Sequence, residues 1–259
     1  MTPEFEPRVA LASLSGESDA QWARNAAEYV GAAFLGGIAL DEPTRTAARE
    51  LVERDRTEFL PPDPVAFIDE QLAALDSEPL LAGFNVRAAT LTPLEQAAEV
   101  CADHDAILEV NAHCRQDEMC HAGAGEALLT DPDRLCEQVR AARRAGADVS
   151  VKVRAEVPGV DLPVLARQIE GAGASIVHVD AMDSEPVIRD VSEATDLVVI
   201  ANNGVRDRET VREYLSCGAD AVSVGRPSDN PTVLGRVREA TDEWFTEIEN
   251  DMRQATDSR

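Results

Sequence analysis

Lysine is almost missing from this 259-residue chain, because only one of its 24 basic residues, Lys152, is a lysine. A soluble protein of this length ordinarily carries about a dozen or more. Lys152 lies in the apolar stretch Val149–Arg154, which has the alternation of a strand. A compact ammonium and a planar guanidinium are not interchangeable at a binding site. Lys152 is therefore either a functional residue or a chance survivor whose tip reaches water.

Positive charge as a whole is scarce, with 49 acidic residues against 24 basic ones and a formal charge of −25. Such a field repels nucleic acids and anionic membranes unless a local basic patch overrides it. The composition resembles that of cytoplasmic proteins from salt-loving archaea, in which salt screens the self-repulsion. On this interpretation the acidity reflects the solvent, and we expect a cytoplasmic location.

Long apolar runs are also lacking, and none approaches the length of a membrane span, so we expect no membrane partner. The N-terminal residues Met1–Glu6 have no signal-peptide pattern. Five cysteines without scaffold spacing favour reduced thiols over disulfides. Aromatic residues make up only 4%, but hydrophobic residues reach 44%, which is enough for a large core.

What the chain does contain is a regular alternation of short apolar runs with amphipathic stretches. The runs predict eight strands: Arg8–Ser13, Ala32–Ile38, Leu80–Arg87, Ala106–Asn111, Val149–Arg154, Ser175–Asp180, Leu197–Asn202 and Ala219–Val224. The stretches predict helices, for example Ala20–Val30, Pro93–Ala102, Asp133–Ala145, Leu162–Ala172 and Arg208–Ser216. Eight β/α units predict an α/β fold, a single-domain (β/α)₈ TIM barrel, with a doubly wound open sheet as the alternative.

Three details complete the expected domain organisation. Thr92-Pro93 and Asp131-Pro132 have the pattern of helix starts. The segment Glu42–Glu78 predicts two helices broken at Pro61-Pro62. We expect the barrel to occupy residues 1–245 and to be followed by a polar tail at 246–259, which comprises the end of the last helix and a frayed terminus.

Strand alternation divides the residues into two faces. In the fifth strand Val149, Val151 and Val153 share one side, so Ser150, Lys152 and Arg154 share the other and are expected to face the lumen. The same alternation points three further pairs inward: Asn85 with Arg87, Glu109 with Asn111, and His178 with Asp180. Barrel enzymes place their sites at this end of the strands. The alternative is a self-satisfied ion network, such as Glu109 with Lys152 and His178 with Asp180.

Two turns have the position of a phosphate site. Asn203-Gly204 follows the seventh strand and Gly225-Arg226 follows the eighth. Loops after these strands commonly bind phosphate through backbone N–H groups. Each turn alone is ordinary, but together they predict phosphate binding.

The loop after the fourth strand, residues 111–125, admits three interpretations. His113, Cys114, Cys120 and His121 could ligate zinc, although their spacing fits no standard site. Cys114 could be a general acid that protonates a bound ring. The cysteines could instead be inert fillers, which is our interpretation of Cys101, Cys136 and Cys217.

Together these segments resemble the tRNA-dihydrouridine synthases, over roughly the third to the eighth strand. The similar stretches are Val110–Cys114, Gly123–Pro132, Val149–Arg154, His178, Asn203–Val205, Gly225-Arg226 and Asn230-Pro231. The chain is most similar to a short archaeal branch of these flavin barrels.

The resemblance implies FMN at the barrel mouth. Lys152 would contact the pyrimidine edge of the flavin and stabilise negative charge on it, and Cys114 would give a proton to C5 of a uracil that takes hydride at C6. NADPH or NADH would supply the electrons. The remaining roles fall to three groups: Asn85, Asn111 and His178 at the flavin; Asn203, Gly204, Gly225 and Arg226 at its phosphate; and Asn111, Arg154 and His178 at the substrate. No metal is implied.

Several departures bear on the substrate. The family's Gly-Cys-Pro is His113-Cys114-Arg115 here, and Glu118 stands where a basic residue is usual. The family's C-terminal helical tRNA-binding domain has no counterpart after the eighth strand. These departures and the net charge weaken tRNA as a partner and leave the flavin prediction in place. The alternatives are a dihydroorotate- or dihydropyrimidine-dehydrogenase-like enzyme acting on a free pyrimidine, and a non-catalytic flavin- or phosphate-binding barrel.

Overall fold

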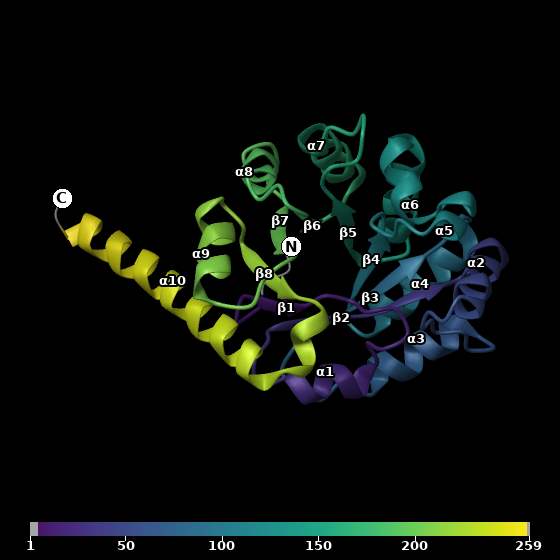
Figure 1. Ribbon diagram of the computed structural model, residues 1–259, viewed down its shortest axis with the longest axis horizontal. Helices are drawn as coiled ribbons and strands as arrows, with labels where there is room; N and C mark the ends of the chain where they lie inside the picture. Colours follow the sequence, from purple (N-terminus) through teal and green to yellow (C-terminus); the bar gives the residue numbers. More distant parts are fainter. Residues whose placement is uncertain (1–4, 258–259) are drawn as a thin grey trace.

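Eight parallel strands form a closed barrel in the computed structural model, which describes residues 5–257 (Figure 1). The strands pair in chain order, and β1 closes the ring against β8. Their bounds are β1 (Val9–Leu11), β2 (Ala32–Ala39), β3 (Leu81–Arg87), β4 (Ile107–Asn111), β5 (Asp148–Arg154), β6 (Ile176–Asp180), β7 (Val198–Asn202) and β8 (Ala221–Val224). This confirms the (β/α)₈ barrel and excludes the open sheet.

The helices surround the barrel on its outside (Figure 1). They are α1 (Ala20–Ala26), α2 (Glu42–Glu53), α3 (Pro64–Ala73), α4 (Leu91–Asp103), α5 (Asp117–His121), α6 (Pro132–Arg144), α7 (Leu162–Ala172), α8 (Val187–Ser192), α9 (Arg208–Ser216) and α10 (Pro231–Asp257), with 3₁₀ turns η1 (Gly125–Thr130) and η2 (Arg226–Asp229). The predicted break at Pro61-Pro62 is confirmed, because these prolines lie between α2 and α3.

Capping residues explain several helix ends. Asp131 accepts a hydrogen bond from the backbone N–H of Arg134, as its pairing with Pro132 predicts. The start expected at Thr92-Pro93 is wrong, because α4 begins at Leu91 after Thr90. Pro93 falls in the first turn, where its missing N–H costs no hydrogen bond.

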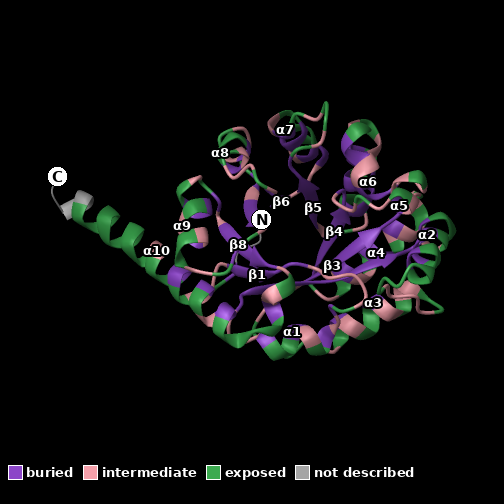
Figure 2. Ribbon diagram, viewed as in Figure 1, coloured by how far each residue is buried: buried purple, intermediate pink, exposed green. Residues whose placement is uncertain are grey.

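The polar tail contains the end of the last helix, since α10 continues unbroken to Asp257. One ion pair and one cation–π contact help to explain the extension: Arg212 of α9 contacts Glu247 at 2.7 Å, and the guanidinium of Arg8 lies over the Phe245 ring. The far half of α10 extends away from the barrel and is exposed (Figures 1 and 2). Residues 1–4 and 258–259 lie outside the described residues.

The two faces of the strands have different neighbours. Val149, Val151 and Val153 point outward and pack under the helices in the main apolar core. The base of the lumen is a smaller apolar cluster, which includes Phe34 and Ile176. Full burial of a valine or isoleucine stabilises a fold by about 1.5–3 kcal/mol. Above this apolar base the lumen becomes polar.

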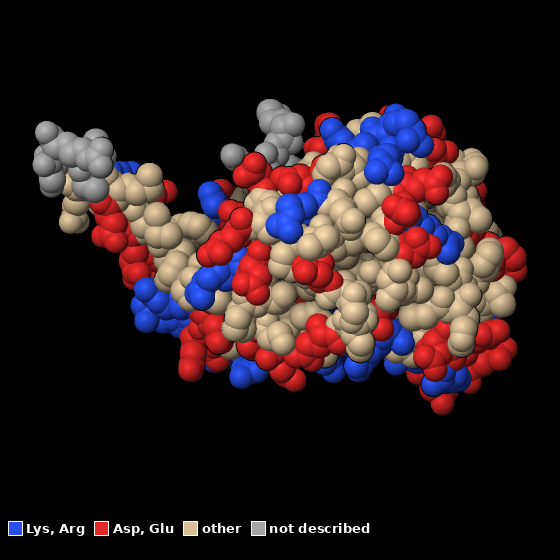
Figure 3. All heavy atoms as spheres, turned by 90° about the horizontal axis from the view of Figure 1, so that it is seen from above, with Lys and Arg blue, Asp and Glu red and all other residues tan. Residues whose placement is uncertain are grey.

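Surface charge follows the acidic composition. On the face shown in Figure 3, acidic and basic side chains are both spread over the surface.

Among the described residues, no helix combines the length and the apolar character that a membrane span requires. The cytoplasmic location stays a prediction.

Candidate functional site

Directly above the apolar base lies a closed network of buried polar side chains, which we call the lower layer: Asn85, Glu109, Ser150, His178 and Ser223. Glu109 accepts hydrogen bonds from Asn85 at 2.7 Å and Ser150 at 3.0 Å, and it contacts His178 Nδ1 at 2.8 Å. The other ring nitrogen of His178 lies 2.7 Å from the Ser223 hydroxyl. Every one of these side chains is 0% exposed, and each finds its partner inside the layer.

Electrostatics agree with an ionised Glu109. Burial alone would raise its pKa, but the charges of His178 and Lys152 and the hydrogen bonds lower it to about 2. Burial lowers the pKa of His178. The alternative pairing of His178 with Asp180 is wrong, because the histidine contacts Glu109 instead. The His178 ring lies two residues deeper on β6 than the Asp180 carboxylate, so these two side chains belong to different layers.

Lys152 lies above the lower layer, at the mouth of the barrel. The side chain of Lys152 is 3% exposed. In the part of the chain that the structure describes, its ammonium forms no hydrogen bond or ion pair. The Glu109–Lys152 pair of the alternative network is therefore not formed. Burial lowers the pKa of Lys152, and Glu109 and Asp180 offset this only in part. The side chain is held within the barrel, and it borders open cavity space without a partner among the described residues. Its pocket therefore has the chemistry of a ligand site.

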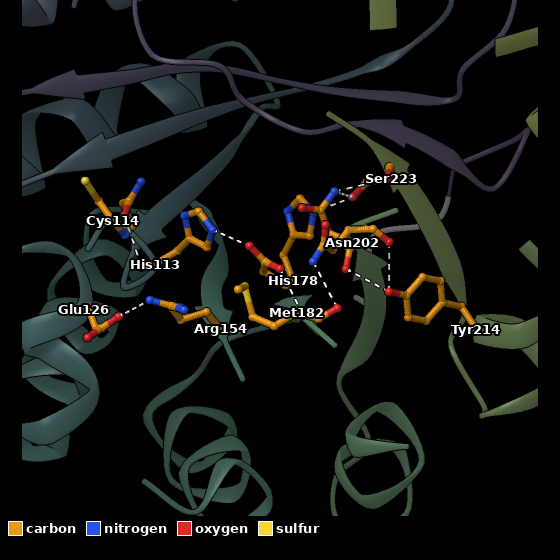
Figure 4. Close-up of polar contacts among 12 residues, drawn as sticks. His113, Cys114, Glu126, Arg154, His178, Met182, Asn202, Tyr214 and Ser223 are labelled. Carbon is orange, nitrogen blue, oxygen red and sulfur yellow. Dashed lines mark hydrogen bonds and ion pairs between the residues drawn. The ribbon is translucent and has the colours of Figure 1, made fainter. Parts of the chain in front are cut away.

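Two cavities meet at Lys152. One of about 460 Å³ is bordered by the loops after β7 and β8, and the other of about 550 Å³ reaches the loop after β4, including Cys114. Both sizes suit a small molecule. Figure 4 shows His113 pointing from the β4 loop toward the residues of β6 and β7, and its Nε2 lies 2.6 Å from Asp180.

The predicted phosphate residues all border the first cavity: Asn203, Gly204, Gly225 and Arg226. Gly204 has φ +67°, and a Cβ at Gly204 or Gly225 would meet no heavy atom of the described chain within 4 Å. Backbone therefore faces open space at both turns. The β7 loop is held in place by Asn203, whose amide donates to the Met182 carbonyl at 3.0 Å and whose own carbonyl accepts from Tyr214 (Figure 4).

The loop after β4 places Cys114 at the second cavity. Asn111 accepts hydrogen bonds from the backbone N–H groups of His113 and Cys114, at 3.1 and 2.9 Å. The amide of Asn111 also donates to Asn85 at 2.8 Å, which ties this loop to the lower layer. Gly125 packs so closely on Cys114 that a Cβ would lie 2.3 Å from the Cys114 carbonyl oxygen. The loop is thus rigidly positioned.

Neither the zinc alternative nor a catalytic role for Cys101 or Cys120 receives support from the described residues. Within residues 5–257 no three or more His, Cys, Asp or Glu side chains are placed to hold a metal ion. Cys120 donates to the Cys114 carbonyl oxygen at 3.5 Å. Cys101 is fully buried, which raises its pKa to about 12 and suits an inert filler.

Two ion pairs at the mouth were not predicted. Arg154 donates to Glu126 of η1 at 2.5 Å (Figure 4), and Arg87 pairs with Glu58 in a contact that is almost fully buried. Glu58 comes from the link between α2 and α3, where the neighbouring Phe59 bridges to Ile38 of β2. No sequence signal distinguishes Glu58 from the many other acidic residues.

The predicted site residues therefore separate into two groups. Those that border the cavities are Asn111, Cys114, Lys152, Arg154, Asn203, Gly204, Gly225 and Arg226. Asn85 and His178 lie one layer lower and border neither cavity, so a direct ligand contact by these two stays a prediction.

A closed barrel of eight parallel strands surrounded by helices belongs to the class of α/β barrels, in which sites lie at the carboxyl ends of the strands. A family profile described as Dihydrouridine synthase (Dus) matches residues 73–256, which is well over half of the chain. The chain belongs to the dihydrouridine synthase family.

Three relatives illustrate the sequence similarity. The chain is 27% identical to an uncharacterized protein of Methanocaldococcus jannaschii, over 95% of both chains. It is 26% identical to tRNA-dihydrouridine synthase B of Xanthomonas campestris, over 89% of this chain and 69% of the relative. It is 25% identical to the catalytic subunit of dihydroorotate dehydrogenase B (NAD(+)) of Streptococcus pneumoniae, over 57% of each.

Solved structures agree on the fold. FabK from Thermotoga maritima is similar with a TM-score of 0.56 and 15% identity, over 85% of this chain and 58% of that one. A chain of the tryptophan synthase complex from Pyrococcus furiosus has a TM-score of 0.56 and 16% identity, over 95% and 98%. At these identities the likeness concerns the fold alone.

Proposed function

We propose that this protein is an FMN-dependent oxidoreductase of the dihydrouridine synthase type that reduces the C5=C6 bond of a uracil ring. The observation that carries the proposal is Lys152, the only lysine, which borders both cavities and has no hydrogen-bond or ion-pair partner among residues 5–257. A ligand with carbonyl oxygens or negative charge would satisfy this ammonium. A flavin ring has such an edge.

The residues present fit FMN. Lys152 would hold the pyrimidine edge of the ring, and Asn203, Gly204, Gly225 and Arg226 would hold the phosphate, since all five border one cavity. Asn111 would orient the ring from the β4 side. We retain Asn85 and His178 as proposed flavin or substrate contacts, although reaching a ligand would require them to leave their present partners.

Cys114 would act as the acid. The chemistry that FMN would supply when bound and reduced by NADPH or NADH is a hydride for C6 of the uracil. The Cys114 thiol would give its proton to C5, so that one hydride and one proton add across the double bond. Lys152 places positive charge at the cofactor edge, and Asn111 and Arg154 would orient the substrate.

Two of the relatives suggest two substrate classes. The similarity to tRNA-dihydrouridine synthase B supports a uracil within tRNA, and the family match favours this class. The similarity to a dihydroorotate dehydrogenase subunit supports a free pyrimidine, to which the charge of −25 poses no obstacle. We propose tRNA as the first candidate and a free pyrimidine as the second.

A single reconstitution tests this function. The protein is loaded with FMN at high salt, reduced, and incubated in parallel with tRNA lacking dihydrouridine, with uridine monophosphate and with orotate. We expect Cys114→Ala to lower product formation by about 10²–10⁴-fold while bound FMN stays unchanged. The matched control is Cys120→Ala, on the same loop. Equal turnover in Cys114→Ala would remove the acid role, and failure of the parent to take up FMN would refute the proposed function.

A further inference from the structure

The ring of His113 stands at the junction of the two cavities. Six side chains border both of them: Ser13, His113, Lys152, Asp180, Asn203 and Arg226. Lys152 and Arg226 can only donate hydrogen bonds. The carboxylate of Asp180 already accepts from the backbone N–H of Met182 at 3.1 Å and contacts His113 at 2.6 Å. Donors and acceptors therefore meet at this junction, and the state of the His113 ring determines which of the two His113 presents.

The contact with Asp180 fixes the state of the His113 ring. Burial opposes ionisation of Asp180, but its bond to His113 and the backbone N–H of Met182 hold its pKa below the ordinary value. An ionised carboxylate only accepts, so the proton of this hydrogen bond must be on Nε2 of His113. Burial, together with the charges of Lys152 and Arg154, lowers the pKa of His113 against the opposing effect of Asp180. The neutral ring with its proton on Nε2 leaves Nδ1 as an acceptor.

Within residues 5–257 the His113 side chain makes no hydrogen bond other than this one to Asp180. Ser13 and Asn203 can also accept, but a hydroxyl rotates and an amide presents a donor beside its acceptor. Neither discriminates strongly between a donor and an acceptor on a ligand. His113 does discriminate, because its only N–H is committed to Asp180.

We propose that His113 is a specificity-determining residue that selects a ring carrying an N–H between two carbonyl groups. The inference rests on the proposed function and deepens it by naming the recognised edge. Lys152 and the nearby donors suit the two carbonyl oxygens, and Nδ1 of His113 suits the N–H between them. Cytosine has an unprotonated nitrogen at that position, so it would face His113 acceptor to acceptor and be rejected.

Two rings at this site have an N–H between two carbonyl groups: the flavin itself and the uracil of the substrate. A binding experiment with two arms distinguishes which of the two rings His113 contacts. In the first arm, the apoprotein is titrated with FMN and with its N3-methyl derivative, and quenching of flavin fluorescence gives the affinities. In the second arm, the FMN-loaded protein is titrated with uridine and cytidine monophosphates, and the shift in flavin absorbance reports binding. Each arm uses the parent, His113→Phe and, as control, His121→Phe, whose histidine lies on the same loop and borders neither cavity.

We expect the parent and the His121→Phe control to prefer the ring with the N–H by about tenfold in one arm, the worth of one hydrogen bond. His113→Phe should lose that preference in the same arm, which identifies the ring that His113 contacts. The proposal is overturned if the parent shows no preference in either arm, a result that needs no variant to fold. It is also overturned if the preference survives in His113→Phe. Absence of FMN uptake by the parent refutes the proposed function as well, whereas uptake with an unchanged preference refutes only the role of His113.

Discussion

Ser150 and Lys152 lie on the same face of β5, two residues apart, yet they belong to two different kinds of polar region. Ser150 is part of the lower layer, in which every side chain satisfies another. Lys152 stands one level higher and has no partner among the described residues. Both residues are polar and buried in the lumen. Burial and polarity therefore do not identify a binding site, whereas a cation that borders a cavity without a partner among the described residues indicates one.

This difference suggests a division of labour along the barrel axis. The lower layer is a platform: Asn85 connects Glu109 to Asn111, and Asn111 holds the backbone of the Cys114 loop. The upper level, with Lys152 and Cys114, borders the cavities. The platform should determine stability, and the upper level should determine binding and turnover. Substitutions in the lower layer should therefore reduce mainly stability, and substitutions at the upper level should reduce mainly binding and turnover.

The largest effect on stability is expected for Glu109→Ala. Removing the carboxylate leaves Asn85, Ser150 and His178 buried without a common partner and leaves Lys152 without its compensating charge. We expect the free energy of unfolding, measured by urea denaturation at high salt, to fall by about 3–5 kcal/mol. The control Glu99→Ala removes an exposed carboxylate of α4 and should change it by less than about 0.5 kcal/mol. Similar losses in both variants would contradict the platform.

Acid should weaken the same platform. The pKa of Glu109 lies at about 2 in the folded protein, below its ordinary value of 4.5. The stability that the ionised group contributes is thus complete above 4.5 and is lost as the pH falls toward about 2. The difference in unfolding free energy between the parent and Glu109→Gln should shrink over that range. A difference that does not depend on pH would mean that Glu109 is not ionised in the fold.

A much smaller effect on stability than that of Glu109→Ala is expected for Lys152→Met. Burial lowers the pKa of Lys152 in the folded protein, so its charge disfavours the fold at neutral pH. Replacing it with an apolar side chain of similar length should leave the free energy of unfolding within about 1 kcal/mol of the parent or raise it. A loss comparable to that of Glu109→Ala would place Lys152 in the platform and remove the contrast.

The sequence predicted the barrel well because burial on both faces leaves a strong pattern. Each strand overlaps its predicted range, and none extends more than one residue beyond it. Alternation also placed Lys152 and Asn111 on the lumen face. These features depend on local periodicity, which one sequence contains in full.

The pairing of side chains was harder to predict. His113 reaches Asp180 because a loop carries it over β5, and Glu58 reaches Arg87 from the link between two helices. Such contacts depend on loop paths, which periodicity does not encode. The depth of His178 and Asn85 depended in the same way on the stagger between strands. The extension of α10 depends partly on tertiary contacts, such as that between Arg212 and Glu247.

The central claim is that Lys152 is a ligand-binding cation, and the affinity for FMN tests it most directly. FMN is titrated into the parent, Lys152→Arg and Lys152→Met, with the fold of each verified by its denaturation curve. We predict that the parent binds FMN and that both variants bind it at least about tenfold more weakly, since a planar guanidinium does not fit the place of a compact ammonium. Equal affinity in all three folded proteins would contradict the account and make the single lysine an accident of composition.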